Sequence, residues 1–172
     1  MIICAMITLS GCSANKSEGA AGGNGVVAAG ETKAETTEAQ IDKFAFVSGD
    51  VTIRMHDDVS GIIAALGDPD NYAESPSCAF EGIDKIYSYK GFDIYTYPDG
   101  DKDFVNSVYF TDDEVSTPAG IRIGSTVDEV TAAYGDNYEE EFEVYTYTEG
   151  KTKLAFLTTD GVVDSIEYSA IQ

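Results

Sequence analysis

The amino-acid sequence predicts an α+β fold made of two tandem units, each a short helix packed on a three- to four-stranded antiparallel sheet. Three observations support this prediction. The chain repeats itself, because residues 57–68 align with residues 125–136, and residues 105–108 align with residues 163–166. Each copy opens with an apolar stripe of helical spacing, and each continues with short alternating or apolar runs bounded by glycine-containing turns. The first copy carries an insertion between its helix and its strands, at residues 68–85.

The two helices are predicted from apolar positions at i, i+3, i+4 and i+7, which form one stripe on each helix. Asp57 or Asp58 can cap the first helix, and Thr126 begins a capping box with the glutamate three residues later. Gly67 and Gly135 supply the C-terminal stops. Because helices of about ten residues are too short to be stable alone, both are expected to lie on a sheet. The stripes are Val59, Ile62, Ile63 and Leu66 in the first copy and Val127, Val130, Thr131 and Tyr134 in the second.

The remainder of each copy is predicted as an antiparallel meander of strands. Ahead of the first helix, residues 44–47 and 51–55 flank Gly49 and Asp50 and predict a further hairpin. The runs predicted as strands span residues 86–89, 92–97 and 105–110 in the first copy and residues 144–147, 154–157 and 163–168 in the second.

A low-complexity segment precedes these units. Residues 13–43 are rich in Gly, Ala, Ser, Thr, Glu and Lys and contain no aromatic residue. Such a segment cannot bury enough apolar surface to offset the entropy of ordering it. The sequence therefore divides into a leading segment (residues 1–11), a linker that begins with a cysteine (12–43), a first unit with an N-terminal hairpin (44–117) and a second unit (118–172).

The chain is strongly acidic, with 31 Asp and Glu residues against 10 Lys and Arg residues and a net charge of −21. From residue 44 onward the counts are 26 and 7. Such a field repels the phosphates of nucleic acids and anionic lipid headgroups, so neither is an expected partner. Cations, basic proteins or basic components of a cell wall are compatible partners. The alternative is a solvated acidic surface that keeps an exported protein soluble.

Residues 9–12, Leu-Ser-Gly-Cys, follow an apolar stretch and precede the linker. They resemble the processing site of bacterial lipoproteins, which implies that residues 1–11 are removed as a signal peptide and that Cys12 is lipidated. Acyl chains contribute about 0.8 kcal/mol per buried methylene and hold a domain on a membrane without a spanning helix. We therefore expect a lipid anchor on the extracellular face of the cell membrane. Because residues 1–8 lack Lys and Arg, we expect the precursor to begin upstream of Met1.

A second resemblance concerns the fold. Residues 120–130, closed by Tyr134 and Gly135, look like the opening motif of small helix-plus-meander domains. The motif is similar to that of the β-lactamase inhibitor protein and of the small lipoproteins of outer-membrane assembly. Residues 44–170 also resemble exported lipoproteins of Gram-positive anaerobes, which share the Ser-Cys-Ala-Phe stretch found at residues 77–80. The resemblance implies a protein-binding scaffold, and no motif here matches the contact residues of the inhibitor.

The cysteines limit the chemistry that the folded part can perform. Cys4 and Cys12 belong to the signal segment and the anchor, so Cys78 is left without a partner for a disulfide or a cysteine-based metal site. We expect Cys78 to be a small buried residue. A thiol enzyme would need the sole histidine, His56, which we expect to have a capping or packing role beside the first helix. We therefore expect no enzyme, with a small hydrolase or thiol enzyme using Cys78 and His56 as the alternative.

No metal or cofactor is expected. Residues 99–103 place carboxylates at positions 1, 3 and 5 of a calcium loop, but Phe104 and Phe110 occupy the positions that need Gly and Glu. This stretch predicts a hairpin turn, and weak binding of divalent cations is the alternative.

Five tyrosines are the candidates for contact with a partner, because tyrosine gives a large contact area at low entropic cost. Two of them share one parity on a predicted strand, and two others do so on the next strand, so each pair projects onto one face of the sheet. Cross-strand pairs that only stabilise the sheet are the alternative. We expect an anchored module that binds an exported protein or a cell-wall component, mainly through the inserted loop at residues 68–85. The candidate residues are Tyr72, Tyr87, Tyr89, Tyr95 and Tyr97.

Overall fold

The computed structural model describes residues 42–172. The predicted signal segment, Cys12 and nearly all of the predicted linker lie outside the described residues. The folded part already includes Asp42, whose carboxylate accepts a hydrogen bond from the Phe44 N–H (3.1 Å) and pairs with Arg54 (3.1 Å).

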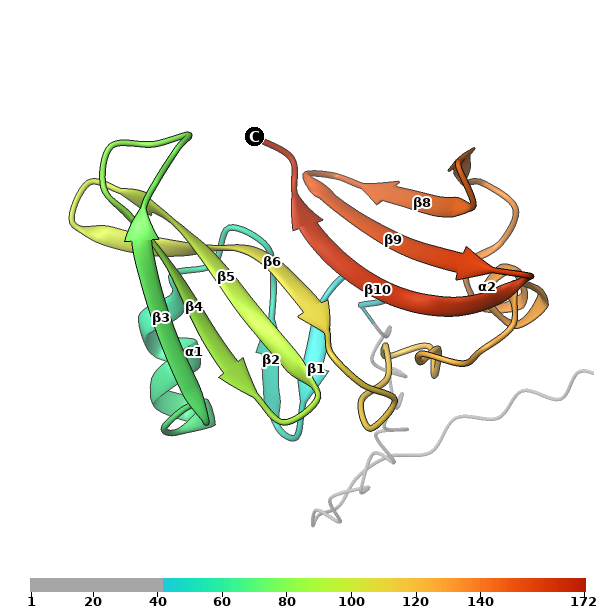
Figure 1. Ribbon diagram of the computed structural model, residues 1–172, viewed down its shortest axis with the longest axis horizontal. Coiled ribbons are helices and arrows are strands. Elements are labelled where there is room, and N and C mark those ends of the chain that lie inside the picture. The colour runs from blue at the N-terminus through green and yellow to red at the C-terminus, as the bar shows by residue number, and fades with distance from the viewer. Residues whose placement is uncertain (1–41) are drawn as a thin grey trace, which may run out of the picture. The chain divides into compact units, whose positions relative to one another are not determined.

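Two helices and ten strands occur in residues 42–172 (Figure 1). The first half of this part begins with a hairpin and a helix, and the second half begins with a helix. The elements are β1 (Phe46–Ser48), β2 (Val51–Ile53), α1 (Val59–Leu66), β3 (Asn71–Pro76), β4 (Ile83–Tyr89), β5 (Phe92–Asp99), β6 (Lys102–Phe110), α2 (Val127–Tyr134), β7 (Glu139–Glu141), β8 (Val144–Glu149), β9 (Thr152–Thr159) and β10 (Val162–Ala170).

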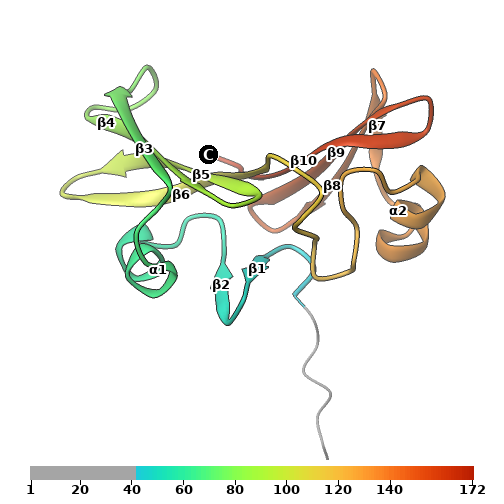
Figure 2. The same ribbon diagram turned by 60° about the horizontal axis from the view of Figure 1, so that its bottom comes forward.

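Eight of the strands form one antiparallel sheet in the order β3-β4-β5-β6-β10-β9-β8-β7. The predicted α+β class with antiparallel strands is confirmed. The four strands that follow α1 and the four that follow α2 join edge to edge, because β6 pairs with β10 through Tyr109–Glu167, Val108–Tyr168 and Ser107–Ser169. Figure 2 shows both helices and the β1–β2 hairpin on the same side of this sheet.

The helix boundaries follow the predicted caps. Asp58 caps α1 and accepts a hydrogen bond from the Ser60 N–H at 3.0 Å. Its ion pair with Lys102 (2.7 Å) and the bonds from Ser60 hold the pKa of the Asp58 carboxyl well below its usual range. Thr126 and Glu129 form the predicted capping box of α2. The helices end at Gly67 and Gly135, which both adopt positive φ as predicted.

The prediction of a loop at residues 68–85 is wrong, because this segment contains the strand β3, which pairs with β4 over its whole length. All six residues of β3 are exposed, and so are the three residues of β7 at the other end of the sheet. A strand that is exposed on both sides shows no alternation of apolar and polar residues, so its sequence resembles a loop.

The core lies between the sheet and the helix-bearing layer, and Phe46 of β1 occupies its centre. The Phe46 side chain is fully buried. Its ring centroid lies 4.8 Å from Phe92, 5.0 Å from Phe110 and 6.4 Å from Tyr168. These partners belong to β5, β6 and β10. The β1–β2 hairpin therefore packs on the helix side of the sheet, against the two strands that join its halves.

We predict that Phe46→Ala lowers the free energy of unfolding by about 3–5 kcal/mol, because it removes a buried ring and leaves a cavity beneath the join. Urea denaturation followed by circular dichroism measures the change. Val47→Ala is the control, since Val47 is the next residue and is 41% exposed, and its effect should stay within about 0.5 kcal/mol. Equal effects of the two substitutions would contradict the central role of Phe46.

Candidate functional site

The two faces of the sheet differ in what covers them. Directly opposed residues of antiparallel strands project to the same face, so the strand register assigns each side chain to a face. The helix side receives a row of apolar and aromatic residues that runs from Tyr87 through Ile94, Val108, Tyr168 and Leu154 to Tyr147. The other side, which we call the open face, is covered by no helix or strand of residues 42–172 (Figure 2).

The open face combines hydroxyl groups, carboxylates and a few large apolar groups. Tyr109 and Leu157 are large apolar side chains of this face that are exposed, at 37% and 43%. Tyr95 of β5 is half-buried, with Ile86 of β4 on one side and Ser107 of β6 on the other. Such a mixture supplies apolar contact and hydrogen bonding together, as recognition surfaces do. The open face includes Asn71, Ala73, Ile86, Ser88, Asp93, Tyr95, Tyr97, Ser107, Tyr109, Glu139, Glu141, Val144, Thr146, Thr148, Lys153, Ala155, Leu157, Ser165, Glu167 and Ser169.

The five candidate tyrosines do not form one surface. Tyr72, Tyr87 and Tyr89 project to the helix side, whereas Tyr95 and Tyr97 project to the open face. The Tyr72 and Tyr87 rings pack as a cross-strand pair at 5.1 Å. The Tyr89 hydroxyl donates to the Gly67 carbonyl (3.0 Å), so this residue ties β4 to the end of α1. Parity along one strand does not reveal which face a pair occupies, since that depends on the register with neighbouring strands.

Tyr97 is the centre of an aromatic cluster at the end of β5. Its ring stacks on Phe104 (5.7 Å) and packs against Phe80 (5.1 Å). Burial raises the pKa of the Tyr97 hydroxyl. His56 Nδ1 is hydrogen-bonded to this hydroxyl at 2.9 Å, and the His56 backbone has a positive φ of 68°. His56 therefore has the predicted packing role, while Asp58 is the cap.

The prediction that Cys78 is buried is wrong, because its side chain is exposed. Cys78 lies in the turn between β3 and β4, where Ser77 Oγ accepts hydrogen bonds from the N–H groups of Ala79 and Phe80. The turn follows the edge strand β3, and Phe80 of the same turn packs against Tyr97 of β5 at 5.1 Å. Within residues 42–172, Cys78 and His56 form no hydrogen bond with each other, and the imidazole is instead held by Tyr97.

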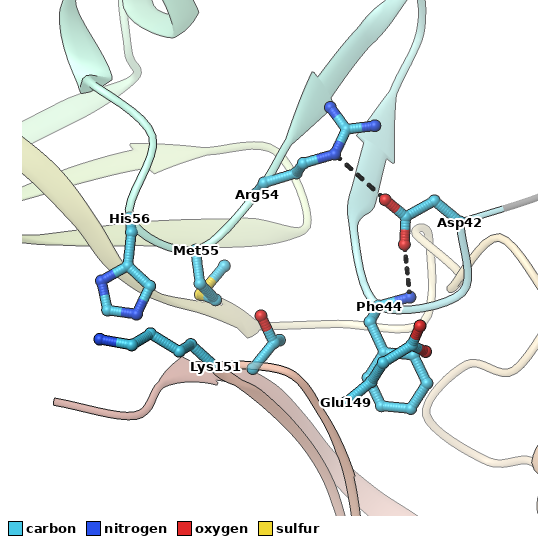
Figure 3. A pocket seen from close by; sticks show the side chains of 8 residues that line it. Asp42, Phe44, Arg54, Met55, His56, Glu149 and Lys151 are labelled. Carbon is cyan, nitrogen blue, oxygen red and sulfur yellow. Dashed lines mark hydrogen bonds and ion pairs between the residues drawn. The ribbon is translucent and has the colours of Figure 1, made fainter.

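A pocket of about 300 Å³ opens beside His56 and joins residues that are distant in the sequence (Figure 3). Arg54 and Asp42 lie on one side and form an ion pair at 3.1 Å, with both side chains about half exposed. Glu149 and Lys151 reach the pocket from the turn between β8 and β9, and Figure 3 shows the Lys151 chain extending toward His56. The charges of opposite sign balance, so the pocket favours neither a cation nor an anion.

The acidic turn predicted at residues 99–103 is present. Asp99 lies opposite Lys102 in the strand register at this turn, and Gly100 has a positive φ of 60°. The Asp103 carboxylate is held by Lys85 at 2.6 Å. In the described part of the chain, no group of three or more His, Cys, Asp or Glu side chains is arranged to hold a metal ion. The helices of residues 42–172 are too short to cross a membrane.

No protein-family model matches this chain. A search of curated proteins finds no significant match either. Among solved structures, a distant neighbour is an extracellular protein containing a SCP domain from Bacillus anthracis str. Ames, with 12% sequence identity and a TM-score of 0.41. The similarity covers 67% of this chain and 44% of that one, so the chain spans less than half the length of this neighbour.

We predict that a maleimide labels Cys78 in the native protein nearly as fast as in urea, because the thiol is exposed. Cys4→Ser and Cys12→Ser remove the other thiols, and mass spectrometry follows the labelling. His56→Ala should leave the rate unchanged, since the imidazole is bonded to Tyr97. A several-fold slower reaction in the His56→Ala variant would show that the imidazole activates the thiol.

Proposed function

We propose that this chain is an exported, lipid-anchored binding module that docks a protein with a basic surface on its open face. The observation that carries the proposal is the unequal cover of the sheet. One face is buried under two helices and a hairpin, whereas the other leaves Tyr109 and Leu157 exposed across the middle of the eight strands. Exposed aromatic and aliphatic groups surrounded by hydroxyls are typical of surfaces that bind other proteins.

The charge of the open face selects the partner. Asp93, Glu139, Glu141 and Glu167 lie on this face, against the single cation Lys153. The carboxylates are the same in sign as the overall charge of −21, so a basic partner is steered toward the face and an acidic one is repelled. Nucleic acid and anionic lipid are disfavoured for the same reason. A partner with a basic surface is therefore favoured over a neutral or an acidic one.

The proposed location rests on the N-terminal sequence. The Leu-Ser-Gly-Cys stretch at residues 9–12 is typical of a lipoprotein signal, and the acylated Cys12 would hold the module on the extracellular face of the membrane. The linker that follows would let the domain stand away from the headgroups, which its own charge disfavours.

We further propose that residues 44–117 and 118–172 arose by duplication of one helix-plus-meander unit. The aligned segments of the sequence support this, and so does the recurrence of a helix followed by four antiparallel strands. We also propose a fold similar to that of the β-lactamase inhibitor protein and of the small assembly lipoproteins, on the basis of the motif at residues 120–130.

We predict that Cys12→Ala moves the protein from the membrane fraction to the soluble fraction, because the acylated side chain is lost. The measurement is fractionation of cells that express the precursor with its complete N-terminus, followed by immunoblotting. Cys78→Ala is the matched control and should stay in the membrane fraction. Retention of the Cys12→Ala protein on the membrane would contradict a lipid anchor.

We predict that a photo-crosslinking residue at position 109 captures a basic protein of the cell envelope. The same residue at position 47, which is also exposed but lies on the helix side in β1, should not do so. Adducts should decrease as salt is raised, because charges more than about 8 Å apart are screened at physiological ionic strength. Mass spectrometry identifies the adduct. Equal adducts at both positions, or none at position 109, would refute docking on the open face.

A further inference from the structure

The two edges of the sheet are protected to different degrees. An edge strand presents unpaired backbone groups, and proteins usually protect it with charges, proline or short length. The β7 edge has three residues, and all of them are glutamates. The β3 edge has six residues with one charge, Glu74, and its proline is the last residue of the strand. Only β3 therefore offers a strand long enough for another strand to pair with.

Two independent observations identify the backbone groups that point away from the sheet. The Ser77 N–H donates to the Gly82 carbonyl (3.0 Å), so Ser77 is directed toward β4. Hydrogen-bonded residues alternate along an antiparallel strand, so every second residue of β3 is directed toward β4 in the same way. The backbone N–H and C=O groups of Tyr72 and Glu74, which lie between these residues, therefore point away from the sheet. Lys85, which lies opposite Glu74, confirms the alternation. Its N–H donates to Thr96 Oγ1 (3.1 Å), and its carbonyl accepts from the same hydroxyl (3.3 Å), both on the side of β5.

The side chains beside this edge define the chemistry of what it would bind. Tyr72 is 45% exposed and packs on Tyr87, so it offers an apolar surface to an incoming side chain. Glu74 lies two residues further on the same face and accepts a hydrogen bond from the Tyr72 hydroxyl at 2.8 Å. Residues 68–85 contain five carboxylates and one cation, Lys85, which is already paired with Asp103. The surroundings of β3 therefore favour a basic strand over an acidic one.

We propose that the β3 edge binds an extended, basic peptide segment of a partner as a ninth strand of the sheet. The backbone of the segment pairs with the outward groups of Tyr72 and Glu74. An apolar residue of the segment packs beside Tyr72, and a Lys or Arg two positions away from it pairs with Glu74. This site is distinct from the open face, because it uses backbone groups at the sheet edge rather than side chains on the face.

The test uses the full chain carrying Cys12→Ser and a fluorescent peptide, Thr-Lys-Thr-Val-Thr-Lys-Thr, whose symmetry presents the same pattern in both strand directions. Glu74→Ala and Glu74→Pro form a matched pair. Both remove the carboxylate, but only proline removes the outward N–H, and proline is tolerated at such a position of an edge strand. Fluorescence polarisation should show binding that is weaker for Glu74→Pro than for Glu74→Ala by about fivefold, the effect of one lost hydrogen bond.

The same peptide N-methylated at every residue has no N–H groups to donate, and its methyl groups keep its backbone away from the strand edge, so it should not bind. This comparison needs no protein variant and remains valid if Glu74→Pro does not fold, which thermal unfolding would reveal. Tyr109→Ala should leave peptide binding unchanged, which separates this site from the open face. Equal binding of the methylated and unmethylated peptides, equal affinities of the two Glu74 variants, or no binding by the unaltered protein would overturn the proposal. Dimers in sedimentation equilibrium that Glu74→Pro dissociates would also overturn it, because a second copy would then occupy the edge.

Discussion

The structure depends on the pairing of β6 with β10 and on the aromatic packing beneath it. The two strands share only three register pairs, so backbone hydrogen bonds alone hold the halves together weakly. Phe46 packs against Phe110 of β6 and Tyr168 of β10, and this buried contact adds the stability that the short ladder lacks. Because the join is continuous, the open face extends over both halves as one surface. A partner that docks there contacts strands from each half.

The elements that the sequence predicted well are those whose local chemistry and burial agree. The caps of both helices follow from Asp58 and Thr126, and the helices end where Gly67 and Gly135 allow positive φ. The central strands could be predicted because one side of each is buried, and this burial produces an alternation of apolar and polar residues along the strand. β3 and β7 were missed because all of their residues are exposed, so burial imposes no pattern on them.

The candidate site was harder to predict because it depends on contacts between distant segments. The tyrosines were found from their type, but their division between two faces follows from the register of β4 with β5. Cys78 was expected to be buried on the basis of residue type alone, whereas its position on a turn beyond an edge strand leaves it exposed. No local pattern near His56 indicates that Lys151 would line the same pocket.

The join between β6 and β10 also has a consequence for how the chain would fold during the export that we propose. A chain that crosses a membrane unfolded emerges from its N-terminus, so the first half has its four strands available long before β10 arrives. Until then the β6 edge is unpaired and the Phe46 ring lacks one of its aromatic neighbours. Pairings between strands that are remote in the chain form slowly, and open edges invite association between nascent chains. The acidic charge of the domain makes such chains repel one another, so the charge opposes their aggregation while the sheet is still incomplete.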